Sequence, residues 1–468
     1  MLRALRAENP GMKLKDLINA YREDDPPPFI ANKPLGLSEL TQYLTALDSC
    51  FSRLKTDDRV CLCVEDPLLF YLALIQLDGA VARLAVVPSG QPEEHYLRLV
   101  DKLRPSHFIT DQDMAFLACA SNCHVITINE DVWRHRALKT TRPFGQSVVS
   151  EWVIPTSGTS NNIKLVRHDI ASLLRSVRKK SENSRQRRWA CLYETARFAG
   201  LQVFLQSLAG GSSLVLPEPG VSFSQSVGNL IDHGCNAISG TPSLFRKLLM
   251  APDVKKLPLR QITLGGEIVD QQVLDSLKGA FPSARITHIY ATTETGVVFS
   301  VHDGLAGFPA AMVDGGNLKI KDDTIYVKLK DTRKDLFVGG AVSLKDGFYD
   351  TKDRVRLEGE RYVFLGRDDG SVNIGGEKVF PEEIEQVFLS HPAVASALVT
   401  SRPSALVGYL LSATLTLRGE EHKGRDEQIN EIRRFVSRRL PKHKIPYNIM
   451  IQDELELNTS GKMKRISS

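Results

Sequence analysis

The stretch TSGTSNNIK, residues 156–164, follows the apolar run WVIP at 152–155, which predicts a buried strand. A loop at the end of a strand can present backbone N–H groups and hydroxyls to one small volume, and a glycine lets a ligand approach the backbone closely. This pattern predicts a phosphate-binding loop, with a Ser/Thr-rich surface loop as the alternative. The Walker pattern GxxxxGK[ST] is absent, which disfavours a kinase or GTPase. The candidate phosphate ligands are Thr156, Ser157, Gly158, Thr159, Ser160 and Lys164.

Short β-rich runs alternate with segments of helical period on both sides of this loop. Before it, DRVCLCVED (58–66) precedes PLLFYLALIQLDGA (67–80), and VARLAVVP (81–88) precedes EEHYLRLVDKLRP (93–105). The same order returns after the loop, from SSLVLPE at 212 to RITHIYA at 285–291. Strands that alternate with helices are typical of a parallel sheet covered by helices. We therefore predict an α/β protein with two doubly wound βα layers.

The pattern changes near Asn317. Runs such as LKIKDDTIYVKLK (318–330) alternate short strands with tight turns, which favours antiparallel hairpins and a small β-barrel-like region. The segment GRDDG (366–370) concentrates turn-forming and charged residues, and helix-period and β-rich runs follow it. We predict a large N-terminal domain, residues 1–368, and a small α+β C-terminal domain, residues 369–468.

The composition excludes several classes of protein. The chain has 468 residues, and 60 Lys and Arg against 55 Asp and Glu leave a net charge of +5, which is too small to indicate nucleic acid or membrane binding. The basic run RKKSENSRQRR (178–188) has no interleaved aromatic residue, which favours a solvated helix end over a nucleic-acid site. The seven cysteines form no CxxC pair, which indicates reduced thiols rather than a disulfide framework or a zinc site. With neither a signal peptide nor a run of about 18 apolar residues, we expect a cytoplasmic protein.

A second polar stretch, IYATTETG at 289–296, lies about 130 residues after the loop. We expect a strand that ends at Tyr290, followed by a turn that contains Thr292, Thr293 and Glu294. A carboxylate at a strand end near a phosphate-binding loop can hold a Mg²⁺ ion that neutralises a triphosphate. The alternative is a helix N-terminal cap with Glu294 in the first helical turn.

Six motifs, which occur along the chain in the order expected for the family, resemble those of the adenylate-forming superfamily, which contains acyl-CoA and aryl-CoA synthetases, adenylation domains of peptide synthetases and luciferases. The family's phosphate loop TSG[ST]TGxPKG is similar to residues 156–165, and its YGxTE is similar to residues 290–294, with Ala291 in place of glycine. Its GGE is matched at 265–267, and its TGD is matched by TKD at 351–353. Its GRxD, Gly-Gly-Glu loop and PxEIE are similar to GRDDGSVNIGGEKVFPEEIE (366–385), and its terminal NxxGKxxR is similar to NTSGKMKR (458–465). The resemblance runs through most of the chain.

This resemblance implies an enzyme that uses ATP and Mg²⁺ to join a carboxylic acid to AMP. Lys462 would bridge the attacking carboxylate and the α-phosphate, and Glu294, beside Thr293, would hold the Mg²⁺. Both reactants are anionic, so charge neutralisation and alignment must supply most of the barrier reduction. Asp353 and Arg367 suit the ribose hydroxyls, and Tyr290 offers a flat face for adenine. The implied nucleotide site comprises Thr156, Ser157, Gly158, Thr159, Ser160, Lys164, Gly265, Gly266, Glu267, Tyr290, Ala291, Thr292, Asp353 and Arg367.

In such enzymes the small domain rotates between two half-reactions. Asp369 would be the hinge, and Gly375 and Gly376 would let a slender pantetheine arm pass the backbone. The chain departs from the family pattern at several positions. The expected consequence in the phosphate loop is weaker ATP binding or altered contacts to the β- and γ-phosphates, and Lys352 adds a cation near the predicted ribose site. The substituted loop positions are Asn161, Ile163 and Leu165.

The substrates are less well specified. YETARFAGLQVFL (193–205) falls where the family lines its acyl pocket, and Phe198 with Gly200 favours a compact aromatic or cyclic acid over a long fatty chain. The segment YET lacks the aspartate of the peptide synthetase pattern FDxS, which disfavours an amino acid as the acyl donor. We expect coenzyme A as the acceptor. The alternatives are an amine, as in coronafacate ligase-like enzymes, a separate carrier protein, or a nucleotide-binding regulator without turnover.

Overall fold

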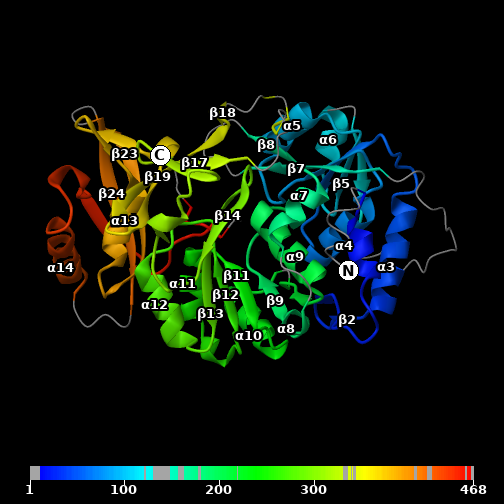
Figure 1. The fold of residues 1–468 in the computed structure, drawn as a ribbon, viewed down its shortest axis with the longest axis horizontal. Helices are drawn as coiled ribbons and strands as arrows, with labels where there is room; N and C mark the ends of the chain where they lie inside the picture. The colour runs from blue at the N-terminus through cyan, green and yellow to red at the C-terminus, as the bar shows by residue number, and fades with distance from the viewer. Residues whose placement is uncertain are drawn as a thin grey trace.

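The computed structural model describes residues 11–120, 123–129, 148–156, 163–177, 181–218, 220–329, 336–338, 340, 344–404, 408–418, 424–458 and 461–464. Two sheets covered by helices lie side by side, one in blue and cyan and the other mainly in green, and a separate orange and red unit lies at the far end (Figure 1). The predicted fold class, an α/β protein with a large N-terminal part and a small C-terminal part, is confirmed.

The first sheet has six strands in the order β6-β5-β3-β4-β7-β8. All neighbours pair in parallel except β7 and β8, which form an antiparallel pair at one edge. The strands are β3 (Arg59–Cys63), β4 (Arg83–Val86), β5 (His107–Thr110), β6 (His124–Thr127), β7 (Glu151–Pro155) and β8 (Leu165–His168). The helices of this layer are α3 (Leu37–Cys50), α4 (Pro67–Leu77), α5 (Glu93–Leu103) and α6 (Ala115–Ala120).

The second sheet has eight strands in the order β14-β13-β12-β11-β9-β10-β1-β2. Its helices α10, α11 and α12 begin after side-chain caps from Ser222, Thr241 and Asp270. The strands are β1 (Phe29–Ile30), β2 (Pro34–Leu35), β9 (Arg188–Cys191), β10 (Ser213–Val215), β11 (Ala237–Gly240), β12 (Gln261–Leu264), β13 (Arg285–Thr292) and β14 (Gly296–Val301). The helices are α9 (Phe198–Gly210), α10 (Phe223–Asp232), α11 (Pro242–Met250) and α12 (Gln271–Ala280).

The two layers share one hydrophobic core. Helix α4 has almost no exposed residue, as expected for a helix that is apolar all round and lies between two layers. Tyr71 of α4 stacks on Phe204 of α9 with ring centroids 4.4 Å apart, and Phe29 of β1 stacks on both rings. This aromatic contact fixes the first layer against the second, and with it the relative position of their edge strands.

A third, antiparallel sheet follows in the order β15-β20-β19-β17-β16, with β18 paired to β19. It corresponds to the predicted barrel-like region. Its strands are β15 (Phe308–Pro309), β16 (Leu318–Lys321), β17 (Thr324–Lys328), β18 (Leu344–Lys345), β19 (Phe348–Glu358) and β20 (Arg361–Arg367). The short helices elsewhere in the chain are α2 (Leu14–Asn19), α7 (Ile170–Leu173), α8 (Glu182–Arg185), η2 (Leu174–Ser176), η3 (Val254–Lys256), η4 (Ala310–Met312), η5 (Asp368–Gly370) and η6 (Lys442–Lys444).

The C-terminal unit has its own small core. Helices α13 (Pro381–Leu389) and α14 (Arg425–Ser437) pack on the sheet β23 (Val394–Ser404), β24 (Gly408–Leu417) and β25 (Asn448–Ile451), beside a hairpin of β21 (Val372–Ile374) and β22 (Glu377–Val379). Asp369 lies in η5, and among the described strands none before η5 pairs with one after it. The division into residues 1–368 and 369–468 stays a prediction.

Candidate active site

Two sheet edges meet at the predicted phosphate loop. β8 is the terminal strand of the first sheet and β14 that of the second. His168, the last residue of β8, donates from Nε2 to the carbonyl oxygen of Thr293 at 2.9 Å. At the neck of the loop, the backbone N–H of Thr156 donates to the carbonyl of Lys164 at 2.9 Å. The strand that leaves the loop therefore contacts the turn that carries Glu294.

The central part of the predicted phosphate loop lies outside the described residues. This part contains Ser157, Gly158, Thr159, Ser160 and Asn161.

The Glu294 turn is a β-hairpin and not the N-terminus of a helix. β13 continues to Thr292, two residues beyond the predicted end at Tyr290, and β14 follows the turn. The backbone N–H of Thr295 donates to Thr292 Oγ1 at 3.1 Å, and the hydroxyl of Tyr349 in β19 donates to Glu294 Oε1 at 3.1 Å. Burial and the Glu294 charge raise the pKa of Tyr349, so this hydroxyl stays a donor. The carboxylate of Glu294 is thereby held by the third sheet.

Asp353 lies within β19 and not in a hairpin turn. Lys352, just before it, has a left-handed backbone with φ of 66°, and the register between β17 and β19 shifts here. Tyr290 donates its hydroxyl to Asp353 Oδ2 at 2.6 Å, and Arg367 Nη1 lies 3.5 Å from Oδ1. Burial raises the pKa of Asp353, while the Arg367 charge and the Tyr290 hydrogen bond oppose that rise. The predicted ribose and adenine residues thus form one connected group.

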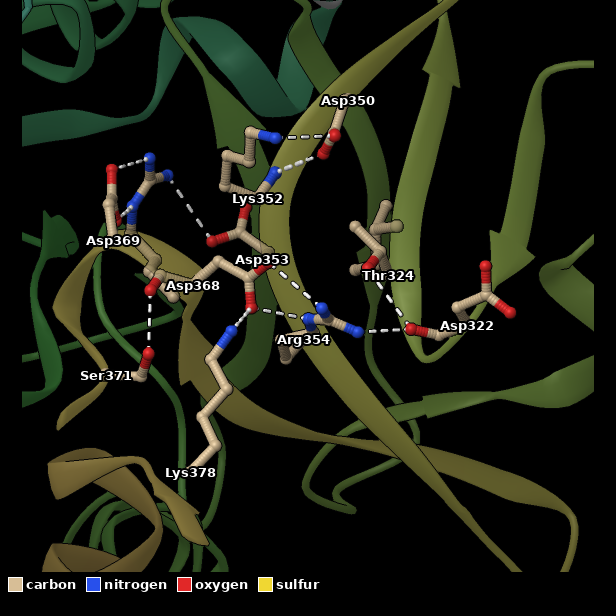
Figure 2. A network of polar contacts seen from close by, with 12 residues as sticks. Asp322, Thr324, Asp350, Lys352, Asp353, Arg354, Asp368, Asp369, Ser371 and Lys378 are labelled. Carbon is tan, nitrogen blue, oxygen red and sulfur yellow. Dashed lines mark hydrogen bonds and ion pairs between the residues drawn. The ribbon is translucent and has the colours of Figure 1, made fainter. Parts of the chain in front are cut away.

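Figure 2 shows Asp353 together with the polar contacts of Asp350, Asp368 and Asp369 around it. Arg367 binds Asp369 through two hydrogen bonds of 3.0 Å, and these bonds and the Arg367 charge lower the pKa of Asp369. The charge of Lys164 lowers it further. The lysine of the phosphate loop and the predicted hinge residue are therefore within electrostatic reach of each other.

Lys462 projects from the C-terminal unit into the same region. Its Cε lies 3.5 Å from the position that a Cβ would occupy at Gly266. Burial lowers the pKa of Lys462, the charge of Glu267 opposes this shift, and the charge of Arg197 adds to it. The charges of Arg367 and Asp353 also act on this ammonium group. The predicted catalytic lysine and the predicted nucleotide residues thus share one electrostatic environment.

The sequence prediction missed Arg197 and its partner Glu194. Arg197 stands at the N-terminus of α9, and its Nε lies 3.0 Å from Glu194 Oε2. The Glu194 side chain is 10% exposed, and its Oε1 has no hydrogen-bond partner among the described residues. The segment YETAR was placed at the acyl pocket and taken to disfavour an amino acid substrate, but its two charged residues were given no role. Its two charges at the start of a helix were a signal that those positions approach the site.

A cavity of about 280 Å³ lies beside Glu294. Its walls include Phe198, His168 and Phe299, and its polar lining includes Arg175 and Gln202. The rings of His168 and Phe198 lie 5.7 Å apart between centroids. This arrangement agrees with the predicted position of Phe198 at an acyl pocket.

Gly200, predicted to line an acyl pocket together with Phe198, is not among the residues that line this cavity. A Cβ at Gly200 would lie only 2.3 Å from the carbonyl oxygen of Glu194. The glycine therefore lets the first turn of α9 pass the preceding backbone. Backbone contact, rather than space for a substrate, explains why this position lacks a side chain.

Gly375 and Gly376 form the turn of the β21–β22 hairpin, with φ of 61° and 90°. Such a turn requires residues that tolerate positive φ. Both are exposed, and an added Cβ at either would meet nothing within 4 Å. Their role beside an acceptor stays a prediction that requires the C-terminal unit to move.

The described residues contain no group of three or more His, Cys, Asp or Glu arranged to hold a metal ion. No helix among them has the length and apolar character needed to cross a membrane. Six of the described cysteines are free thiols.

Comparison with known proteins identifies the family. Residues 38–332 match the model of the AMP-binding enzyme, and residues 383–462 match the AMP-binding enzyme C-terminal domain. The chain is 26% identical to a probable non-canonical nonribosomal peptide synthetase, CymA of Salinispora arenicola, over 84% of this chain and 5% of that protein. It is 27% identical to 4-hydroxybutyrate–CoA ligase 1 of Metallosphaera sedula over 58% of this chain and 52% of that protein, so it spans about half or less of these relatives.

Among solved structures, the fold matches that of the anthranilate CoA ligase AuaEII in complex with anthranoyl-AMP. The TM-score is 0.80 at 16% identity, and the match covers 97% of this chain and 95% of that one. Because both domain models match in order and the first alone covers more than half of the sequence, the chain belongs to the AMP-binding enzyme family.

Proposed function

We propose that this protein activates a carboxylic acid with ATP as an acyl adenylate, releases pyrophosphate, and transfers the acyl group to an acceptor thiol, with coenzyme A as the first candidate. One observation carries the proposal. The cations of Lys462, Arg197 and Arg367 act on one region together with the carboxylates of Glu267 and Asp353. Such a concentration of cations suits a reaction between two anions.

In the first half-reaction, a carboxylate oxygen of the acid attacks the α-phosphorus. The bond from this phosphorus to the bridging oxygen breaks, and pyrophosphate leaves with the electron pair. Lys462 would stabilise the charge that builds up between the two reactants, and Arg197 would add a second cation beside it. Loss of one such donor typically costs on the order of 10²-fold in rate.

The nucleotide would be held by the group around Asp353. This carboxylate accepts hydrogen bonds, which suits ribose hydroxyls, and Arg367 lies next to it at 3.5 Å. The ring of Tyr290 packs 5.2 Å from Phe299 and 5.3 Å from Phe364, and this packing would give adenine a fixed surface. The hydroxyl of Tyr290 would then keep Asp353 oriented.

The donor set near the hairpin turn fits Mg²⁺. Glu294 offers one carboxylate, and Mg²⁺ is commonly bound by one or two carboxylates together with substrate phosphates. When bound, the ion would neutralise the phosphates of ATP. Tyr349 would orient the Glu294 carboxylate by its hydrogen bond of 3.1 Å.

The acid would occupy the cavity beside Phe198. Its volume of about 280 Å³ is below the ~300–1,000 Å³ typical for drug-sized ligands, which favours a compact aromatic or cyclic acid. The aromatic rings of His168, Phe198 and Phe299 suit a flat, apolar substrate.

In the second half-reaction, the acceptor thiol attacks the acyl carbon and AMP leaves. The relatives named as CoA ligases favour coenzyme A. The similarity to a peptide synthetase over most of this chain supports a second candidate, the loading of a separate carrier protein.

The free thiols of the described cysteines support a reducing, cytoplasmic location.

The test combines the full chain, ATP and Mg²⁺ with a panel of benzoate, 2-aminobenzoate, 2-succinylbenzoate, 4-hydroxybutyrate and palmitate. We expect pyrophosphate release with a compact acid and an acyl-CoA product, detected by mass, when CoA is added. Parallel reactions with an amino acid mixture or without an acceptor separate the alternative acceptors. Lys462→Ala should lower the release by about 10²-fold or more. Unchanged AMP production in that variant would refute the proposal, and reaction with palmitate alone would refute the compact-acid substrate.

A further inference from the structure

The loop that carries Lys462 is anchored on both sides of the lysine. On one side, the carbonyl oxygen of Gly461 accepts a hydrogen bond from the hydroxyl of Thr241. On the other side, the backbone N–H of Met463 donates to Glu267 Oε1 at 3.2 Å. Because both anchors act on the backbone next to the lysine, they fix its Cα and not merely the loop as a whole.

The two anchoring side chains are themselves held in place. Thr241 is fully buried and caps α11, because its Oγ1 accepts the backbone N–H of Leu244 at 3.1 Å. Glu267 uses its second oxygen, Oε2, to accept the backbone N–H of Ser243 at 3.0 Å. Both anchors are therefore fastened to the first turn of α11, which gives them one fixed spacing.

The backbone of the loop that carries Lys462 packs closely on the first turn of α11. Gly461 is buried with φ of 70°, and a Cβ there would lie 2.3 Å from Leu244 Cδ1. The side chain of Lys462 then passes over Gly266. Among the charges that act on Lys462, Glu267 contributes the largest effect, and it opposes the lowering of the lysine pKa by burial.

We propose that Thr241 and Glu267 form a tail socket, in which they are positioning residues that dock the C-terminal loop and aim Lys462 at the reacting carboxylate and α-phosphate. This inference rests on the proposed function. Neither residue need touch the reactants, since each acts through the loop backbone. The socket would serve only the first half-reaction, because the second requires Lys462 to withdraw.

Two exposed ion pairs between the two parts of the chain are poor substitutes for the socket. Lys247 of α11 pairs with Glu454 at 2.5 Å, but the two side chains are 36% and 68% exposed. Lys378 pairs with Asp368 at 2.8 Å, also near the surface (Figure 2). Exposed ion pairs contribute little and are screened by salt. Buried, directional hydrogen bonds are better suited to set the position of one lysine.

The first experiment measures docking without any substrate. Glu267→Gln removes the charge and one acceptor, and the matched control is Glu454→Gln, which removes the exposed ion pair between that residue and Lys247 of α11. Hydrogen–deuterium exchange of the full-length protein should be faster at Met463 in Glu267→Gln by about tenfold or more, and unchanged in the control. Equal exchange in the two variants would overturn the socket.

The second experiment separates the half-reactions. With the fastest acid of the panel, Glu267→Gln should slow pyrophosphate release by about tenfold to a hundredfold, and Glu454→Gln by less than about threefold. Transfer to CoA from a supplied acyl adenylate should stay within about twofold of wild type in Glu454→Gln, and in Glu267→Gln it should fall clearly less than pyrophosphate release does. Thr241→Val should slow release similarly, and Thr241→Ser, which keeps the hydroxyl, should recover most of it.

The outcomes distinguish this inference from the proposed function. Equal loss in both half-reactions would mean a general structural role and would overturn the socket. If the wild-type protein releases no pyrophosphate from any acid while Glu267→Gln still frees the loop, the proposed function fails and the docking contact stands.

Discussion

Lys352 is the position where a departure from the family motif coincides with an unusual backbone. Its φ is 66°, a left-handed conformation that costs a residue with a Cβ about 1–2 kcal/mol. The related motif has glycine here, which pays no such cost. The distortion coincides with a shift in the pairing of β19 with β17, and Asp353 beside it contacts Tyr290 and Arg367. A comparison of Lys352→Gly with Lys352→Ala isolates the strain.

Both substitutions remove the same ion pair. Lys352 Nζ lies 2.7 Å from Asp350 Oδ2, but the lysine is half exposed, so its loss costs at most about 1 kcal/mol. Alanine keeps a Cβ and therefore keeps the strain. Glycine relieves about 1–2 kcal/mol of strain but adds about 0.5–1 kcal/mol of unfolded-chain entropy. We expect Lys352→Gly to be more stable than Lys352→Ala by about 0.5–1 kcal/mol.

Urea unfolding followed by tryptophan fluorescence measures this difference. Trp133, Trp152 and Trp189 all lie in the N-terminal part of the chain, so the signal follows the unit that contains β19. The concentration of ATP that half-saturates Lys352→Gly should stay within about threefold of wild type, because glycine adopts the same backbone. An alanine variant as stable as the glycine variant, or more stable, would refute the argument that this position is strained.

Three further predictions concern other parts of the molecule. Tyr349→Phe removes the hydrogen bond to Glu294, and we expect the half-saturating ATP·Mg²⁺ concentration to rise about fivefold or more, measured by pyrophosphate release, with an unchanged unfolding midpoint. Gly200→Ala should lower the unfolding free energy by about 1–3 kcal/mol, because the added Cβ meets backbone atoms. Gly228→Ala, in helix α10 with open space around the added Cβ, should instead raise the unfolding free energy by about 0.5–1 kcal/mol. Equal effects of the two substitutions would contradict the role of backbone contact at Gly200. Burial raises the pKa of Asp78 from 3.8 to about 6, so the folded protein binds a proton between these pH values that the unfolded chain has lost, and the free energy of unfolding falls as pH rises through them. Relative to Asp78→Asn, the wild-type protein should lose up to about 3 kcal/mol of unfolding free energy between pH 4 and 6.5. Parallel pH profiles of the two proteins would refute this.

The order of the secondary structure was readable from the sequence because it depends on local patterns. The alternation of apolar runs with helix-period segments predicted both βα layers, and the change near Asn317 predicted the antiparallel sheet. Boundaries were less accurate where pairing extends a strand. β13 continues to Thr292 because its antiparallel partner β14 bonds to it beyond Tyr290.

The candidate site was predictable only where a motif marked a residue. Lys462, Glu267 and Asp353 were named from motifs that resemble those of the family, and the structure brings them into one region. Gly200 was assigned to a substrate wall, and nothing local could reveal that a carbonyl of its own chain fills the space. Arg197 carried no motif and was missed.

The sequence by itself determined which residue types stand at the ends of strands, because strand and helix periods are properties of neighbouring residues. Only the tertiary structure decided which of those ends meet. The stacking of α4 on α9 sets the two sheets edge to edge, so that His168 reaches Thr293 across 125 residues. Docking of the C-terminal loop on α11 then joins Met463 to Glu267 across 196 residues. Such contacts depend on the packing of whole layers, and no short stretch of sequence encodes them.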